Sequence, residues 1–179
     1  METERLALQP LHLKYADRVE ELANDYDVAK TTLGMPYPYP KGGAKAFIED
    51  RLASEKDGGF VIYAITLKDT DDFIGMITFS INERHKRCEF AYWIGKAYWG
   101  KGYGTEAAKR MLDLAFNELN LNKVYAQAFA GNPGSWRIME KIGMTYEGKL
   151  RQHVSRFDEY HDLVQYGLVR EEYLKKNHI

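Results

Sequence analysis

The sequence lacks the features that mark several large classes of protein. Cys88 is the only cysteine among 179 residues, which excludes an internal disulfide and a cysteine-rich metal site. The formal net charge is −1, so we expect no direct nucleic-acid binding driven by bulk electrostatics. No apolar run approaches the roughly 20 residues of a membrane span. The start at Met1–Arg5 lacks the basic and apolar regions of a signal peptide. We therefore expect a cytoplasmic protein without a membrane partner or a metal.

What is present fits one globular domain. Hydrophobic residues make up 45% and charged residues 28% of the chain, an ordinary composition for a folded soluble domain. A chain of 179 residues can bury roughly two-thirds of the surface of its unfolded state. We predict a single domain over residues 1–179.

The stretch around Gly100, Gly102 and Gly104 is the most informative in the chain. It follows a strand-like run at 89–94 and opens a helix whose apolar residues recur every three or four positions from Ala107 to Leu119. Glycine permits positive φ, and a helix start presents free N–H groups at the positive end of the helix dipole. The stretch therefore suits a phosphate or pyrophosphate, although an ordinary helix entry is the plainer alternative. Neither the P-loop motif nor the dinucleotide motif G-x-G-x-x-G matches the spacing.

The remaining elements alternate between strands and helices. Strands are predicted near 5–11, 60–66, 73–81, 88–94, 124–130, 144–151 and 160–168, and helices near 15–24, 43–55, 103–119 and 132–143. The segment 152–159 is predicted to be a polar excursion between the last two strands. A strand–helix–strand unit across 88–130 implies that its two strands are parallel, with the glycine stretch at the carboxyl end of the first.

Two segments together resemble the GNAT superfamily of N-acetyltransferases. Gly102 and Gly104 match the small positions of its [QR]-x-x-G-x-[GA] loop, although Trp99 stands at the first position. About thirty residues later, Asn132–Met144 resembles the N-x-x-S-x-x-[LVI]-x-E-K-x-G-[FM] segment. The strand 89–94, the opening strand and the tail also resemble the family, so the likeness covers nearly the whole chain. The branch is similar to the ribosomal-protein N-terminal acetyltransferases, which act on alanine or serine.

The resemblance implies a fold and a donor. The fold would be a single α/β (α+β) domain: a mixed, mostly antiparallel sheet of about seven strands, flanked by about four helices, with splayed central strands. The donor would be acetyl-CoA. By their positions in the family motifs, the residues implied to bind it are Trp93, Ile94, Lys101, Gly102, Tyr103, Gly104, Thr105, Asn132 and Ser135.

The resemblance also names two catalytic candidates. Glu89, on a central strand, is either a structural carboxylate or a base that takes a proton through water. Many family members carry a tyrosine general acid where this chain has Met139, and a thioether cannot donate a proton. Either Ser135 hydrogen-bonds the departing thiolate or water protonates it. His153 is a possible substitute for an acidic base that some members have in the tail.

The acceptor is not identified by these motifs. The segment from Pro36 to Pro40 is either a rigid linker or, through Tyr37 and Tyr39, part of an acceptor pocket. We predict direct transfer of acetyl to a primary amine, with a protein N-terminus as the first hypothesis. A small-molecule amine acetyltransferase and a non-catalytic CoA-binding module are the alternatives, and a homodimer is a possible assembly.

Overall fold

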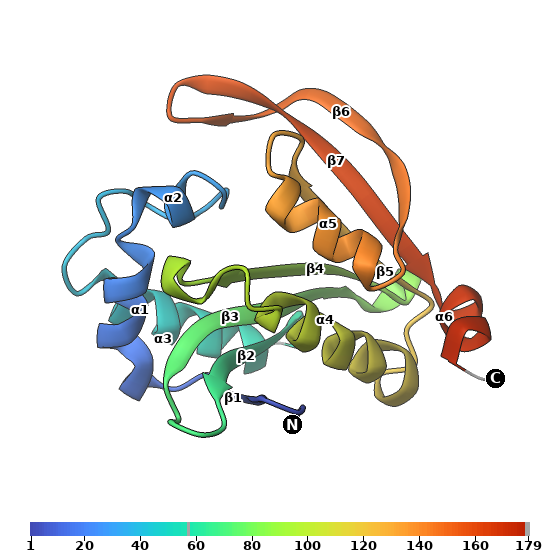
Figure 1. Ribbon diagram of the computed structural model, residues 1–179, viewed down its shortest axis with the longest axis horizontal. Helices are drawn as coiled ribbons and strands as arrows, with labels where there is room; N and C mark the ends of the chain where they lie inside the picture. The colour runs from blue at the N-terminus through green and yellow to red at the C-terminus, as the bar shows by residue number, and fades with distance from the viewer. Residues whose placement is uncertain (57, 178–179) are drawn as a thin grey trace.

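A computed structural model describes residues 1–56 and 58–177; the predicted domain also includes residues 57, 178 and 179, which lie outside the described part. One sheet of seven strands runs through the molecule in the order β1-β2-β3-β4-β5-β7-β6 (Figure 1). The strands are β1 (Leu6–Pro10), β2 (Phe60–Leu67), β3 (Phe73–Asn82), β4 (Arg87–Ile94), β5 (Lys123–Phe129), β6 (Thr145–Arg156) and β7 (Glu159–Val169). All neighbouring pairs are antiparallel except β4 and β5. The mixed, mostly antiparallel sheet predicted from the sequence is confirmed.

The described residues form six α-helices, two more than predicted. They are α1 (Ala16–Ala23), α2 (Tyr26–Ala29), α3 (Gly43–Lys56), α4 (Tyr103–Asp113), α5 (Pro133–Lys141) and α6 (Arg170–Asn177). A π-helical turn, Leu114–Glu118, extends α4. The two helices that the sequence did not reveal are α2, which has only four residues, and α6, which has no buried residue. Neither presents an apolar stripe, the signal by which a helix is recognised in a sequence.

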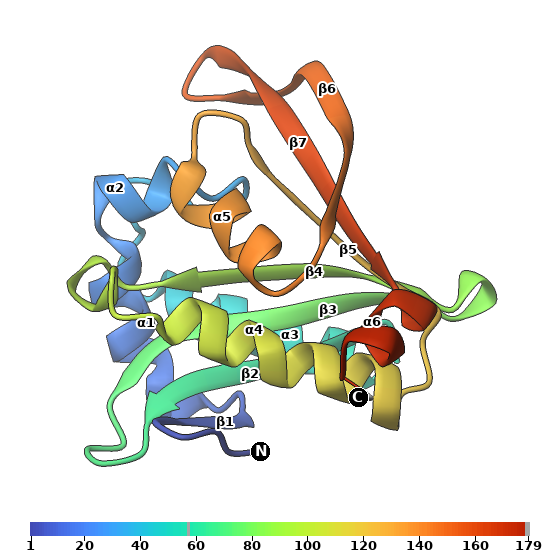
Figure 2. The ribbon, with the colours of Figure 1, turned by 45° about the vertical axis from the view of Figure 1, so that its right-hand side comes forward.

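The helices cover both faces of the sheet. Figure 2 shows α4 and α5 on one side of the strands and α1 and α3 on the other. The larger core lies under α4 and α5 and includes Phe79, Met111, Phe116 and Met139. A smaller core, with Ile48 and Met76, lies under α1 and α3. Alternate residues of β4 therefore enter different environments.

The two central strands are paired along only part of their length. β4 and β5 pair at Arg87–Lys123, Cys88–Val124 and Glu89–Tyr125, and there the ladder ends. β4 continues to Ile94 and β5 to Phe129, so the strands diverge beyond Glu89 and Tyr125. The splay expected from the family resemblance is present.

The last two strands form a long hairpin that rises beside α5 towards α2 (Figure 1). β6 continues to Arg156, so the predicted excursion at 152–159 is wrong: most of it is strand, and Phe157 and Asp158 alone make the turn. Both turn residues have positive φ, 50° and 61°, as a type I′ hairpin turn requires. The polar composition of the segment reflects exposure of an overhanging strand. No described helix is both long and apolar enough to cross a membrane.

Candidate active site

A cleft of about 480 Å³ opens where β4 and β5 diverge. Its floor is the end of β4, and its walls are the glycine stretch, the start of α5 and the segment around α2. The residues that line it are Asp27, Val28, Lys30, Thr31, Thr32, Tyr92, Trp93, Ile94, Tyr98, Trp99, Gly100, Gly102, Tyr103, Gly104, Thr105, Asn132, Pro133, Gly134, Ser135, Arg137, Ile138 and Lys141. The structure thus brings eight of the ten predicted site residues to one cleft. Glu89 and Lys101 are not among them.

The glycine stretch enters α4 through left-handed backbone. Gly100 and Gly102 have φ of 73° and 83°, a region that residues with a Cβ adopt only at a cost of roughly 1–2 kcal/mol. Gly102 is the N-cap, and the N–H groups of Tyr103, Gly104 and Thr105 lie in the first turn, where a helix offers no internal acceptor. Free backbone N–H donors therefore face the cleft at the positive end of an 11-residue helix, and this arrangement favours binding of an anion.

The N-terminal segment before β1 holds this stretch in place. The guanidinium of Arg5 bonds the carboxylate of Glu106 at 2.7 and 2.8 Å and donates to the Lys101 carbonyl at 2.9 Å. It also lies 4.7 Å from the centre of the Tyr103 ring. Thr3 donates a further hydrogen bond of 2.6 Å to Glu106. Burial opposes ionisation of Glu106, but the hydrogen bonds from Thr3 and Arg5 prevail and lower its pKa. These contacts fix the turn before any ligand arrives.

Trp99, which departs from the family pattern, ties the turn to the floor of the cleft. Its indole N–H donates to the carbonyl of Ile94 at 2.7 Å. Ile94 is the last residue of β4, so this bond links the strand end directly to the glycine stretch. Lys101 is not itself among the lining residues, but its ammonium lies 5.6 Å from the centre of the ring of Tyr98, which does line the cleft. Binding of the donor by Lys101 stays a prediction.

Gly104 allows α4, α5 and β4 to come close together. A Cβ added there would lie 2.9 Å from Ile138 Cδ1 and 3.5 Å from both Tyr92 Cε2 and Ile94 Cδ1. On the facing wall, Asn132 is the N-cap of α5, but its side chain makes no capping bond. Its carbonyl instead accepts from the N–H of Ser135 at 3.1 Å. The Asn132 side chain therefore does not cap α5, and Asn132 lines the cleft.

Ser135 faces β4 across the cleft. The Tyr92 hydroxyl donates a long hydrogen bond of 3.4 Å to Ser135 Oγ. Burial raises the pKa of Tyr92 to about 12, against a smaller opposing effect of the Ser135 hydrogen bond, so the phenol stays protonated at neutral pH. Met139, which stands where many family members carry tyrosine, is 1% exposed and belongs to the main core. Sequence reasoning missed Tyr92, although the alternation along β4 places it on the same face as Cys88 and opposite to Glu89.

Glu89 lies at the vertex of the splay, outside the cleft lining. It is the last β4 residue paired with β5, and its carboxylate accepts a long hydrogen bond of 3.5 Å from the Tyr125 hydroxyl. Four residues of strand, roughly 13 Å, separate it from Trp93 in the cleft. Ala91, between them on the same face, is exposed. A role for Glu89 therefore requires water to bridge the gap.

The other end of the cleft is formed by α2 and the residues after it. Asp27 forms ion pairs of 2.5 Å with both Lys30 and Lys96. The hydrogen bonds from Lys30 and Lys96 lower the pKa of Asp27 to about 2. Asp27 is the one carboxylate among the described residues that line the cleft, whereas Lys30, Arg137 and Lys141 are cationic. The cleft is therefore positive on balance.

The tip of the β6–β7 hairpin contacts this same end. The Arg156 guanidinium donates to the carbonyls of Ala29, at 3.0 Å, and Met35. Phe157 lies 5.5 Å from Tyr26, which in turn lies 5.3 Å from Tyr37. All three rings are partly exposed, between 39% and 48%. The hairpin tip and the segment 26–37 thus form one aromatic surface beside the cleft, which we call the aromatic rim.

The two tyrosines of the Pro36–Pro40 segment have different environments. Tyr39 packs against the smaller core, and burial raises its pKa. Tyr37 belongs to the aromatic rim. Neither is among the residues that line the cleft. The linker interpretation accounts for Tyr39, and a contact with an acceptor remains a proposal for Tyr37 alone.

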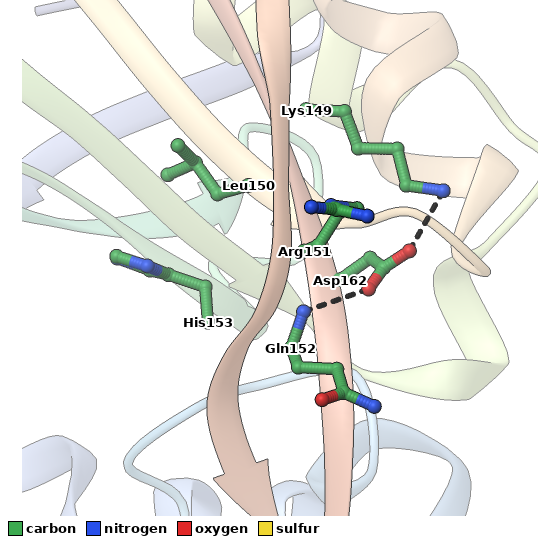
Figure 3. Close-up of a pocket in the computed structure, with 6 residues that line it drawn as sticks. All are labelled: Lys149, Leu150, Arg151, Gln152, His153 and Asp162. Carbon is green, nitrogen blue, oxygen red and sulfur yellow. Dashed lines mark hydrogen bonds and ion pairs between the residues drawn. The ribbon is translucent and has the colours of Figure 1, made fainter.

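A second hollow lies on the outer hairpin strand and contains His153 (Figure 3). Its residues are Lys149, Leu150, Arg151, Gln152, His153 and Asp162. Figure 3 shows Asp162 bonded to the Lys149 ammonium, at 2.7 Å, and to the Gln152 backbone N–H, at 2.8 Å. These contacts hold a bulge where the β6–β7 register shifts between Leu150 and Val154. His153 is exposed, and its hollow shares no lining residue with the main cleft. Its position therefore does not support it as the base.

Comparison with proteins of known sequence gives consistent relatives. The chain is 29% identical over 172 residues to an uncharacterised N-acetyltransferase, p20, of Bacillus licheniformis, and 96% of each chain is covered. It is 38% identical over 100 residues to the proposed ribosomal N-acetyltransferase YdaF of Bacillus subtilis, covering 55% of each. It is 27% identical to the spermidine N(1)-acetyltransferase of Escherichia coli, covering 95% of this chain and 89% of that one.

Solved structures give the same fold. An acetyltransferase of the GNAT family from Bacillus anthracis superposes with a TM-score of 0.85 at 25% identity, covering 96% of this chain and 98% of that one. The ribosomal L7/L12 α-N-protein acetyltransferase RimL, solved with coenzyme A, superposes with a TM-score of 0.87 at 15% identity, covering 95% and 97%. The model of the acetyltransferase (GNAT) domain matches residues 5–145. With the splayed sheet and the glycine turn in place, the chain belongs to the GNAT acetyltransferases and is an N-acetyltransferase.

Proposed function

We propose that this protein transfers acetyl directly from acetyl-CoA to the N-terminal amine of a protein. The observation that carries the proposal is the cleft itself. A glycine turn with free N–H groups at the start of α4 faces Asn132 and Ser135 of α5 across strands that no longer pair. One cleft therefore combines an anion site, a strand edge with no partner and a serine hydroxyl.

The donor half of the cleft fits the parts of acetyl-CoA. The N–H groups of Tyr103, Gly104 and Thr105 are placed to receive the pyrophosphate. Arg137 and Lys141, which also line the cleft, add positive charge for phosphate oxygens. Beyond Glu89 the edge of β4 that faces β5 has no strand partner, so its backbone groups, apart from the Ile94 carbonyl that accepts from Trp99, can bond the amides of the pantetheine arm. Backbone N–H groups near Trp93 and Ile94 would polarise the thioester carbonyl.

We assign activation of the amine and stabilisation of the leaving thiolate to opposite faces of β4. Glu89, Ala91 and Trp93 share one face, and the exposure of Ala91 leaves room for water between Glu89 and the end of the strand. Glu89 would take the proton of the acceptor amine through that water. Ser135, on the other side, would hydrogen-bond the departing thiolate. Glu89 thus acts on the attacking amine, and Ser135 acts on the leaving sulfur.

The charge and surface of the acceptor end favour a peptide. The one carboxylate of the described lining, Asp27, is neutralised by two lysines, so this end offers little attraction to a polycation. The aromatic rim of Tyr26, Tyr37 and Phe157 instead offers partly exposed apolar surface beside the cleft. If the N-terminal residue of a peptide entered the cleft, the residues that follow it would lie across this rim and bury that surface.

A small-molecule amine is the second candidate acceptor. It is favoured by the likeness to spermidine N(1)-acetyltransferase, which extends over 95% of this chain. The family alone does not decide between the two acceptors. Turnover against the two classes of amine does.

The experiment is a thiol-release assay with acetyl-CoA as the common donor. We expect release of CoA with peptides that begin with alanine or serine and little release with spermidine. The reverse preference would move the function to the second candidate. If acetyl-CoA raises the melting temperature and no amine of either class releases CoA, the protein is a CoA-binding module and the proposal is wrong.

The role of Glu89 has a separate test. Glu89→Gln should lower kcat/KM for the acceptor at neutral pH by about 100-fold or more, in the range of general-base catalysis. The loss should shrink as the pH approaches that at which the amine is itself deprotonated. Glu147→Gln is the matched control, because Glu147 is a strand carboxylate paired with Lys123 away from the cleft. A wild-type rate in Glu89→Gln at every pH would remove Glu89 from the reaction.

A further inference from the structure

Tyr92 is the one hydroxyl in the described part of the cleft that contacts Ser135. It lies on β4 three residues beyond the vertex of the splay, where the strand has left β5. It shares the α4–α5 face of the strand with Cys88 and Phe90, whereas Glu89 is on the other face. Tyr92 therefore belongs to the side of the sheet that we assign to the leaving sulfur.

The ring of Tyr92 is held from several directions. It lies 5.4 Å from the Phe90 ring and against Gly104 of the glycine turn, where a Cβ would meet Tyr92 Cε2 at 3.5 Å. The hydroxyl is then directed at α5, where it donates to Ser135 Oγ at 3.4 Å. A ring packed in this way can keep its hydroxyl in one place without a contribution from the ligand.

The direction of this hydrogen bond matters for Ser135. A serine hydroxyl has one hydrogen and two lone pairs. When Tyr92 donates to Oγ, it occupies a lone pair, and the hydrogen of Ser135 is left to point into the cleft. Two hydroxyls in series also polarise one another, which strengthens the second donor.

Resting on the proposed function, we infer that Tyr92 is the positioning residue that turns the Ser135 hydroxyl towards the thioester sulfur. When the amine attacks, the carbon–sulfur bond breaks and its electron pair stays on sulfur. The chain Tyr92 to Ser135 to sulfur stabilises that negative charge by hydrogen bonding. The thiolate then takes a proton from solvent, and the amine proton passes through water to Glu89, which returns it to solvent, so no proton is lost from Tyr92 or Ser135. The pair stabilises the thiolate by hydrogen bonding and does not donate the proton that a tyrosine general acid would supply.

The first test needs no acceptor. The thiol of CoA bound to the wild-type protein is titrated by the ultraviolet absorbance of the thiolate. A hydrogen bond to the thiolate favours the charged form, so the thiol pKa should be lower when CoA is bound to the wild type than when it is bound to Ser135→Ala. In Tyr92→Phe the bound thiol should titrate about one pH unit higher than in the wild type, a tenfold change in the ionisation constant. Titration of Tyr92→Phe at the wild-type pH would overturn the inference.

The second test uses turnover. Tyr92→Phe keeps the ring and its packing but removes the donor, so kcat should fall about tenfold while KM for acetyl-CoA stays within twofold, since a charged hydrogen bond is weakened. In Tyr92→Phe/Ser135→Ala, the loss should be no larger than in Ser135→Ala alone, because both variants interrupt one chain. Additive losses would contradict a shared path.

The matched control is Tyr166→Phe. Tyr166 is a buried tyrosine whose hydroxyl also donates to α5, to Glu140 at 3.1 Å, but it does not line the cleft. This variant should leave both the thiol titration and kcat at wild-type values. If Tyr166→Phe lowers them as much as Tyr92→Phe, support of α5 rather than orientation of Ser135 explains the effect and the inference is wrong.

The two proposals fail in different ways. A protein that binds CoA but acetylates no amine would contradict the proposed function, and the titration would still decide the role of Tyr92. A protein that acetylates an amine while Tyr92→Phe behaves as wild type in both measurements would contradict only the inference. Failure to bind CoA would overturn both.

Discussion

The two ends of the cleft are built in different ways. The donor end is made of regular elements: the last residue of β4, the first turn of α4 and the first turn of α5. The acceptor end is made of a four-residue helix, an irregular segment and the tip of a hairpin. At the donor end, Arg5 and Trp99 bond the turn to neighbouring strands. At the acceptor end, Arg156 makes the comparable bonds to the carbonyls of Ala29 and Met35.

This difference indicates that backbone conformation constrains the donor half of the function more than the acceptor half. An anion bound by N–H groups requires a particular turn, so glycine positions carry the information. An acceptor bound by side chains on an irregular segment leaves the backbone free to vary. If the two ends act independently, a substitution at one end should change the kinetic constants for only one of the two substrates.

The largest expected effect comes from closing the anion site. Gly102→Glu places a carboxylate beside the free N–H groups and a Cβ at a φ of 83°. Acetyl-CoA binding should weaken by at least 100-fold, or about 2.7 kcal/mol, from repulsion and the lost donors. Isothermal calorimetry measures it. Gly58→Glu is the control, because Gly58 has a similar φ of 81° and open space around it, away from the cleft. Equal acetyl-CoA binding by Gly102→Glu and the wild type would refute the anion site.

A second variant addresses the acceptor end alone. Arg156→Ala removes the bonds between the hairpin tip and the carbonyls of Ala29 and Met35. We expect kcat/KM for the acceptor to fall about tenfold, with no change in acetyl-CoA affinity, since charge-assisted bonds contribute roughly 1.5–3 kcal/mol each. Arg151→Ala, on the same strand and exposed, should change neither value. A parallel loss of acetyl-CoA affinity in Arg156→Ala would show that the two ends are coupled.

A smaller effect of the opposite kind is expected at the donor end. Arg5→Ala removes the contacts with Glu106 and the Lys101 carbonyl but no group of the cleft lining. KM for acetyl-CoA should rise about fivefold and KM for the acceptor should not change, because the turn is loosened rather than lost. Lys68→Ala removes contacts of the same N-terminal segment that do not reach the turn, and should match the wild type. An acceptor effect as large as the donor effect in Arg5→Ala would break the comparison.

The stability of the sheet beneath both ends should depend on pH. Burial raises the pKa of Cys88 from its ordinary value of 9.0 to about 12. The folded protein therefore keeps this proton when the unfolded chain has lost it, and stability falls as the pH rises from 9 towards 12. The Cys88 contribution is at most about 4 kcal/mol across that range. Cys88→Ala should show a flatter loss of melting temperature above pH 9 than the wild type. Identical slopes would show that the thiol does not contribute.

Much of the donor half could be predicted from the sequence. Apolar periodicity located α4, the crossover fixed the parallel direction of β4 and β5, and the family motifs selected Gly102, Gly104, Asn132 and Ser135. These features depend on local backbone conformation, and the residue types at each position indicate that conformation directly. Tyr92 was missed because a tyrosine on a half-buried strand has no spacing that separates a cleft residue from a core residue.

The acceptor half could not be predicted in the same way. α2 is too short for a periodic pattern, and the exposed residues of β6 resemble a loop in composition. Contacts such as Arg156 with Ala29 join residues 127 positions apart, which no local signal encodes. The expected position of Glu89 beside the reaction also depended on how far the splay extends along β4, and that is a property of the whole sheet.

The end of the β4–β5 ladder at Glu89 and Tyr125 gives this protein a strand edge in its interior. Exposed edges usually invite pairing with other chains, but this one lies in a cleft of about 480 Å³ between β4 and α5. The amide-bearing arm of acetyl-CoA would then serve as a temporary strand. On that basis, those backbone amides between Phe90 and Ile94 that face β5 should exchange with solvent more slowly when the donor is bound, and the sheet should be continuous only in the donor complex.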